Sequence, residues 1–129
     1  MYLHRDLKPN NFVIGRGSRS NIIYLVDYGL GKAYKDKLTG KHIPFRDNKQ
    51  ITGTIRFASI NAHYGMEQSR RDDMEALGYV FIYLFRGLLP WQKLPKGDQK
   101  RKNDAILQCK INTPIDKLCT GLPCILYAI

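Results

Sequence analysis

The chain has 129 residues, of which 43% are apolar and 25% charged, and this composition is typical of one modest globular domain and excludes a disordered or fibrous chain. The net charge of +10 favours polyanionic partners, which include nucleic acid, phosphate-rich ligands and acidic protein segments. The longest apolar stretch, residues 76–85, is shorter than the roughly 20 residues that span a bilayer, and no charged-then-apolar leader opens the chain. We therefore expect an intracellular protein without a membrane partner, in the cytoplasm, with a nuclear location left open.

Two short strands are predicted near the start of the chain, at residues 12–14 and 22–26, because both runs are rich in strand-forming side chains. The residues between them, 15–21, all favour turns. An antiparallel hairpin of these two strands would bring Asp27 back beside Asn11.

The middle of the chain divides into a loop and a helix. Residues 29–65 are polar and interrupted by Gly and Pro, which predicts a long loop. Ser69 supplies a capping residue for a helix that continues to Phe85 and is apolar nearly all round, so we expect this helix to be buried. Gly87 ends it, and Trp91 is expected in the core.

The last third of the chain is less regular. A basic stretch, residues 93–102, leads to a weaker amphipathic segment at residues 103–110, and no closing element is recognisable before Ile129. The cysteines lack both the C-x-x-C pairs of a zinc site and the density of a disulfide scaffold, so reduced structural thiols are expected at Cys109, Cys119 and Cys124.

Two short stretches, "HRDLKPNN" at residues 4–11 and "DYG" at residues 27–29, carry the groups that phosphoryl transfer needs. Asp6 can accept a hydroxyl proton and Lys8 can neutralise the transferring phosphoryl group. Asn11 and Asp27 offer the oxygen ligands that Mg²⁺ prefers, and the predicted hairpin places them together.

The first stretch resembles the catalytic-loop pattern H-R-D-L-x-x-x-N of protein kinases, and the second resembles their metal-binding D-F-G with Tyr in place of Phe. The alternative is that H-R-D is a solvated turn and D-Y-G an ordinary turn after a strand, but the two motifs occur in the right order across a plausible hairpin. Lys8 lies two residues after Asp6, and a lysine at this position resembles serine/threonine kinases. The resemblance implies ATP and Mg²⁺ as cofactors.

A finer resemblance is to the casein kinase I family, and it extends over residues 2–123. It rests on "HIPFRDNK", "TGTIRFASINAHYGMEQSRRDDMEALGYV" and "LPWQ", and above all on Ser59-Ile60-Asn61, where most protein kinases carry A-P-E and this family carries S-I-N. The implied fold is α+β and mainly helical, the large carboxy-terminal lobe of the kinase fold with a small hairpin. Residues 1–129 are then expected to be a partial kinase domain, cut at both ends and without its small lobe, because no G-x-G-x-x-G-x-V loop or V-A-I-K lysine is present.

The resemblance also implies roles for residues outside the two motifs. Thr54 is expected to bond toward Asp6 and Lys8, and Asp73 to hydrogen-bond the backbone of the catalytic loop at Arg5 and Asp6. For Thr54 the alternative is an ordinary loop residue. For Asp73 it is stabilisation of a helix amino terminus through the helix dipole.

Arg56 and Lys102 match the family's anion pocket, which receives a phosphorylated or acidic side chain of the substrate. The alternative is that the basic run at residues 96–102 is a solvated face.

These patterns lead to a serine/threonine kinase fragment, inactive alone, whose parent enzyme phosphorylates acidic or pre-phosphorylated proteins. The alternative from another class is a catalytically dead, basic binding module derived from a kinase. A nucleic-acid binder is disfavoured because the aromatic residues are not interleaved with the basic run. We expect a monomer.

Overall fold

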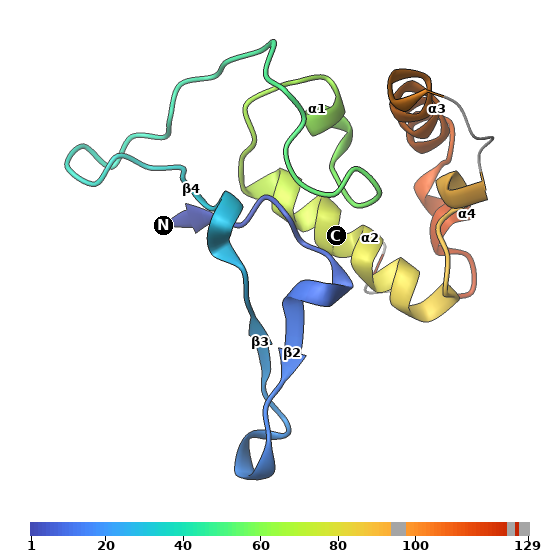
Figure 1. Cartoon of the computed structure of the whole chain (residues 1–129), viewed down its shortest axis with the longest axis horizontal. Helices are drawn as coiled ribbons and strands as arrows, with labels where there is room; N and C mark the ends of the chain where they lie inside the picture. Colours follow the sequence, from blue (N-terminus) through green and yellow to red (C-terminus); the bar gives the residue numbers. More distant parts are fainter. Residues whose placement is uncertain (94–97, 124–125, 127–129) are drawn as a thin grey trace.

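The computed structural model describes residues 1–93, 98–123 and 126. Figure 1 shows a body of helices from which a β-hairpin projects, and a long loop that runs along the side opposite the hairpin tip. The strands are β1 (Tyr2–Leu3), β2 (Phe12–Ile14), β3 (Ile23–Leu25) and β4 (Lys32–Ala33). The α-helices are α1 (Ile60–His63), α2 (Arg70–Arg86), α3 (Gln99–Ile111) and α4 (Ile115–Cys119), and short 3₁₀ turns occupy Pro9–Asn11, Gly17–Arg19, Tyr28–Leu30 and Pro90–Lys93.

The predicted hairpin is confirmed. Strand β2 pairs antiparallel with β3, with Phe12 opposite Leu25. The pairing continues one step beyond the strands, because the Val26 N–H donates to the carbonyl oxygen of Asn11 at 2.9 Å. Asp27 therefore follows directly after the residue that is bonded to Asn11, as the sequence predicts.

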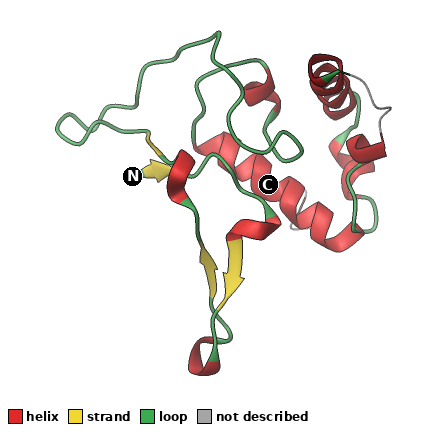
Figure 2. Ribbon diagram, in the orientation of Figure 1, coloured by secondary structure: helices red, strands yellow, loops and turns green. Residues whose placement is uncertain are grey.

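The prediction that residues 29–65 form one long loop is wrong in two places. Strand β4 pairs antiparallel with β1, in a second small sheet. Helix α1 is capped by Ser59, whose hydroxyl accepts from the Ala62 N–H at 3.1 Å. Figure 2 shows both elements as brief interruptions of a green loop. Elements of two and four residues are too short to produce a periodic pattern, so sequence periodicity misses them.

Helix α2 begins and ends where the sequence predicts. Ser69 and Asp72 form a capping box at its amino end, and Gly87 terminates it with a left-handed φ of 75°. The prediction that the helix is buried nearly all round is wrong. The described residues cover one face, which buries Val80 and Ile82, whereas Phe85 is 60% exposed on another face.

The core lies between α2, α3, α4 and the turn after α2. Its buried members are Phe57, Tyr79, Val80, Ile82, Leu89, Trp91, Ile106, Leu118, Cys119 and Leu126. Trp91 is 2% exposed and meets the Tyr79 ring edge to face, with centroids 5.0 Å apart, so its predicted place in the core is confirmed.

The carboxy-terminal part contains more helix than the sequence predicts. Helix α3 begins earlier than the amphipathic segment, because Asp98 caps it by accepting from the Arg101 N–H at 2.8 Å, and α4 has no counterpart among the predicted elements. Cys109 and Cys119 are free thiols, as expected, and burial raises the pKa of Cys119. Cys124 and residues 94–97 of the basic stretch lie outside the described residues. None of the helices in the described ranges has the length and apolar character to cross a bilayer.

Candidate active site

The loop that carries "HRD" is held by the first turn of α2. The carboxylate of Asp73 accepts from the backbone N–H of His4 at 2.7 Å and from that of Arg5 at 2.9 Å. The expected support for the loop is therefore present, but it acts on His4 and Arg5 and not on Asp6. These charge-assisted bonds hold Arg5 in a left-handed conformation with φ of 65°. The neighbouring Asp72, and not Asp73, caps the amino end of α2.

His4 joins the same loop to the hairpin. Its imidazole is 4% exposed, with Nε2 3.0 Å from the carbonyl oxygen of Val26 and Nδ1 3.3 Å from the backbone nitrogen of Asp6. Because the carbonyl can only accept, Nε2 carries the hydrogen and Nδ1 accepts. His4 is not among the site residues predicted from the sequence, although its place in the H-R-D pattern was the available signal.

Two predicted site residues, Thr54 and Lys8, converge on a third, Asp6. One carboxylate oxygen, Oδ1, accepts from both the N–H and the hydroxyl of Thr54, each at 2.7 Å, and Oδ2 accepts from the Lys8 ammonium at 2.6 Å. Burial alone would raise the pKa of Asp6, but the bonds from Lys8 and Thr54 outweigh it and hold this pKa below its usual value. The carboxylate is therefore charged and oriented at neutral pH.

The approach of Thr54 to Asp6 depends on the glycine before it. Gly53 has a φ of 89°, which L side chains rarely adopt, and a Cβ there would lie 2.3 Å from the carbonyl oxygen of Arg5. The segment that carries Thr54 can therefore reach the loop that carries Asp6 only with glycine at this position.

Asn11 and Asp27 both lie at the base of the hairpin, where Asn11 is bonded to Val26, the residue before Asp27. The Asn11 side chain donates through Nδ2 to the Asp6 carbonyl oxygen at 2.9 Å, so its Oδ1 is the atom that remains to bind a ligand. Asp27 is exposed, and its carboxylate accepts from the Gly29 N–H at 3.3 Å. Among the described residues no cluster of three or more His, Cys, Asp or Glu is arranged to hold a metal.

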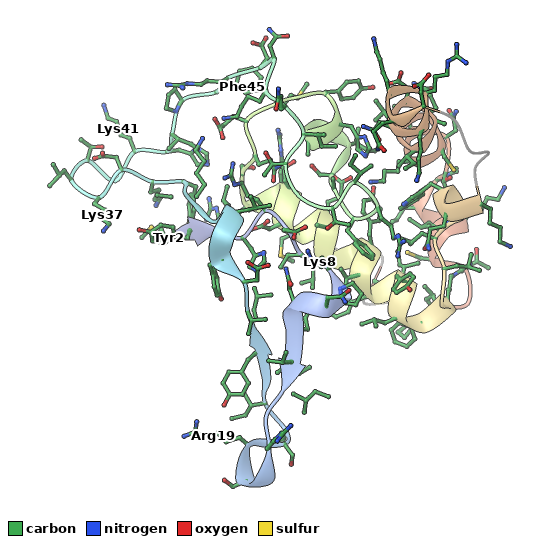
Figure 3. The ribbon with its side chains drawn as sticks, viewed as in Figure 1. Tyr2, Lys8, Arg19, Lys37, Lys41 and Phe45 are labelled. Atoms are coloured by element: carbon green, nitrogen blue, oxygen red, sulfur yellow. The ribbon has the colours of Figure 1, made fainter. Side chains whose placement is uncertain are left out.

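Two hard oxygen donors nevertheless fit Mg²⁺, which commonly takes one or two protein ligands and completes its shell with water and substrate phosphates. The Lys8 ammonium lies close to this pair. Its pKa is raised first by the hydrogen bond to Asp6 and further by the charge of Asp27. Figure 3 shows Lys8 where the hairpin meets the helical body, far from Arg19 at the hairpin tip.

Arg56 and Lys102 line one surface hollow of about 270 Å³, together with Thr54 and Trp91. The Arg56 guanidinium lies 5.7 Å from the ring centres of both Phe57 and Tyr83, within the range of cation–π contact, and both Arg56 and Lys102 are exposed. The structure thus brings these two cations next to Thr54, although they lie far apart in the sequence.

A buried acid that is absent from the sequence predictions fixes the long loop. Glu67 accepts from Lys32 at 2.8 Å and from Lys49 at 3.0 Å. Burial would raise the pKa of Glu67, but the two lysines outweigh it and lower this pKa. Nothing local in the sequence marks Glu67, because its partners lie 35 and 18 residues away.

Residues 1–120 match the protein kinase domain, and the chain therefore belongs to the protein kinase family. The match includes residues 4–11, which contain Asp6 and Asn11, and residues 27–29, which contain Asp27. Kinases of this family transfer a phosphoryl group from ATP with the help of Mg²⁺.

Proposed function

We propose that this chain is part of a serine/threonine protein kinase of the casein kinase I type, and that its fold is the large lobe of such an enzyme. In this proposal the chain binds the protein substrate whose hydroxyl group accepts the phosphoryl group. The observation that carries the proposal is the Asp6 carboxylate, fixed by Thr54 on one oxygen and by Lys8 on the other. The S-I-N sequence at residues 59–61 supports the particular family. Ser59 is 2% exposed and donates to Asp72 at 2.6 Å, so it belongs to the framework beneath the site.

Asp6 orients the acceptor hydroxyl and receives its proton. A carboxylate with a lowered pKa is a weak base, so the proton moves as the new phosphorus–oxygen bond makes the hydroxyl acidic. Thr54 fixes the carboxylate, and Lys8 supplies positive charge beside the transferring group.

The Oδ1 atom of Asn11 and the carboxylate of Asp27 would hold Mg²⁺. When bound, the ion supplies positive charge against the nucleotide phosphates. The hairpin keeps its two ligands together through the bond from the Val26 N–H to the Asn11 carbonyl oxygen.

The substrates are proposed to be proteins in which an acidic or phosphorylated side chain accompanies the target Ser or Thr. The hollow that Arg56 and Lys102 share with Thr54 supports this, because an anion bound there would lie next to the residue that contacts Asp6. The enzyme is proposed to act as a monomer on protein substrates and not on nucleic acid.

The 129 residues contain no G-x-G-x-x-G sequence, the loop that covers the ATP phosphates in protein kinases. Activity assays therefore use a completed kinase, defined as a polypeptide in which a casein kinase I small lobe precedes Met1.

Three peptides are compared that share an upstream phosphoserine and differ only in the acceptor, which is Ser, Thr or Tyr. We expect phosphorylation of the Ser and Thr peptides and not of the Tyr peptide. Equal transfer to Tyr would contradict the serine/threonine assignment, and no transfer to any peptide would favour a binding module.

A further inference from the structure

We propose that Lys110 is a positioning residue for the substrate, because its buried ammonium group fixes residues 54–58. This segment carries Thr54 to the catalytic loop and Arg56 to the surface hollow that it shares with Lys102. The role of residues 54–58 in binding a substrate rests on the proposed function, whereas the contacts of Lys110 with this segment do not depend on it.

Lys110 lies on the inner face of α3 and is 4% exposed. Its Nζ donates to the carbonyl oxygen of Ile55 at 3.0 Å, to that of Ala58, and to Nε2 of His63 at 3.2 Å. An ammonium group has three N–H donors, and all three are used. The same Nζ lies 5.0 Å and 5.2 Å from the ring centres of Tyr79 and Trp91.

Trp91 extends this set of contacts along the segment. Its indole N–H donates to the carbonyl oxygen of Arg56 at 2.8 Å. Three carbonyl groups of the segment, those of Ile55, Arg56 and Ala58, are therefore bonded by Lys110 and Trp91 together.

The same segment also contributes two side chains to the site. The N–H groups of Phe57 and Ala58 close a turn on the carbonyl oxygen of Thr54, at 2.9 and 3.1 Å. This turn leaves the Thr54 side chain on Asp6 and the Arg56 side chain in the hollow. Because Lys110 anchors the backbone between Thr54 and Arg56, a shift of this anchor would move both side chains relative to Asp6 and to the hollow.

A buried lysine is a costly way to stabilise a core, and this favours a positioning role. Burial lowers the pKa of Lys110 to about 7, although the charge of Glu75 acts to raise it. An apolar side chain of similar volume would avoid that desolvation cost but would remove the donor that the Ile55 and Ala58 carbonyl oxygens share.

The other titratable groups that face Lys110 are His63 from α1, and Glu75 and Tyr79 from α2. The pKa of His63 is lowered to about 4, by burial and by the charge of Lys110, so this imidazole is neutral and accepts from the lysine. Glu75 Oε1 accepts from the Tyr79 hydroxyl at 2.7 Å and from the Ile60 N–H at 2.9 Å. The ammonium therefore has neutral acceptors in direct contact and one carboxylate near them.

Amide hydrogen exchange of the 129-residue chain tests the inference without requiring catalysis. The variant Lys110→Met removes the charge and keeps the length, and Lys100→Met is the matched control because Lys100 is exposed on the same helix. We expect Lys110→Met to accelerate exchange at the amides of Phe57 and Ala58 by about tenfold or more. The Gly87 amide, which is bonded to Tyr83 at 2.8 Å at the far end of α2, should stay within about twofold of its original rate. Unchanged rates at Phe57 and Ala58, or equal acceleration at Gly87, would overturn the proposal.

Trp91→Phe is the second variant. It removes the donor to Arg56 but keeps an aromatic ring beside Lys110, and it should accelerate the same two amides even if Lys110→Met does not fold. If Trp91→Phe accelerates exchange at Phe57 and Ala58 no more than at Gly87, the proposal is likewise overturned.

The completed kinase separates positioning from general stability. Lys110→Met should raise KM for a phosphoserine-containing peptide about tenfold with a smaller change in kcat, and Lys110→Arg, which keeps the charge, should recover part of the loss. An unchanged KM would overturn the positioning role. Absence of activity in the unsubstituted completed kinase would instead contradict the proposed function, because the exchange result does not depend on it.

Discussion

The backbone N–H and the hydroxyl of Thr54 both donate to the same oxygen of Asp6, each at 2.7 Å. This contact joins two segments 48 residues apart and fixes the carboxylate on one side, while Lys8 fixes it on the other. In the proposed function, this contact sets where an acceptor hydroxyl can lie relative to Asp6.

The contact makes Gly53 a sensitive position. Gly53→Ala should lower the free energy of unfolding by about 2–4 kcal/mol, since it combines a left-handed backbone with a Cβ placed 2.3 Å from the Arg5 carbonyl oxygen. Gly17→Ala is the control, because Gly17 has a φ of 57° but no atom within 4 Å of its Cβ position, and strain alone should cost about 1 kcal/mol. Denaturant unfolding of the 129-residue chain measures both, and equal losses would show that the close approach to Arg5 is unimportant.

The hairpin contact between Asn11 and Val26 leads to a prediction for the metal. In the completed kinase, Asp27→Asn should reduce kcat by about a hundredfold or more at ordinary Mg²⁺ because the site loses its one charged ligand, and added Mg²⁺ should restore only part of the rate. Asp116→Asn makes the same chemical change on α4, away from the site, and should leave the rate unchanged. A normal rate for Asp27→Asn would remove this residue from the metal site.

The hollow that contains Arg56 and Lys102 predicts selectivity and not chemical rate. Changing both to Ala should lower kcat/KM about tenfold for a phosphoserine or acidic peptide, since each charge-assisted contact is worth roughly 1.5–3 kcal/mol when buried and less when exposed. A neutral peptide should be almost unaffected. The matched control changes Arg19 and Lys37 to Ala, two cations that Figure 3 shows on the hairpin tip and on the long loop. Equal effects on both peptides would indicate that Arg56 and Lys102 are a solvated basic face.

Lys110 predicts a particular dependence of stability on pH. Its pKa is about 7 in the folded chain, whereas an unburied lysine has an ordinary pKa of 10.5, so between these pH values the unfolded chain binds more protons. The contribution of Lys110 therefore makes the free energy of unfolding rise with pH across this window, and each pKa unit of difference corresponds to about 1.4 kcal/mol.

Lys110→Met should remove that contribution. The free energy of unfolding of the variant, relative to the unsubstituted chain, should be most favourable near the folded-state pKa of about 7 and should fall as the pH rises toward the ordinary value of 10.5. Lys100→Met is the control for the loss of an exposed lysine from the same helix. A constant difference for Lys110→Met would mean that the lysine keeps an ordinary pKa in the fold.

The sequence predicts the elements and contacts whose determinants are local. Ser69 and Gly87 mark the two ends of α2, and the turn residues at 15–21 specify a hairpin whose register brings Asp27 to Asn11. The family pattern predicts that Thr54 approaches Asp6, which no local pattern could show.

Contacts between distant residues that the family pattern does not mark could not be predicted. Nothing in the sequence distinguishes Lys110 from the other lysines of this basic chain. Only the packing of α3 against residues 54–58 shows that it is buried. Glu67 is found only through Lys32 and Lys49. The sequence overestimates the burial of α2 for a related reason. An apolar sequence does not show which faces of its helix the neighbouring elements cover.

Phosphoryl transfer from ATP to the serine of a phosphoserine-containing peptide, catalysed by the completed kinase with and without Asp6→Asn, is the most direct test of the role of Asp6. The amide keeps the size and one oxygen of the side chain but cannot accept the hydroxyl proton as a carboxylate does, and general-base catalysis typically contributes about 10²–10⁴-fold. We expect Asp6→Asn to lower kcat by about a hundredfold or more while peptide KM changes little. A completed kinase whose turnover is the same with Asp6 and with Asn at this position would contradict the claim that Asp6 is the centre of the site.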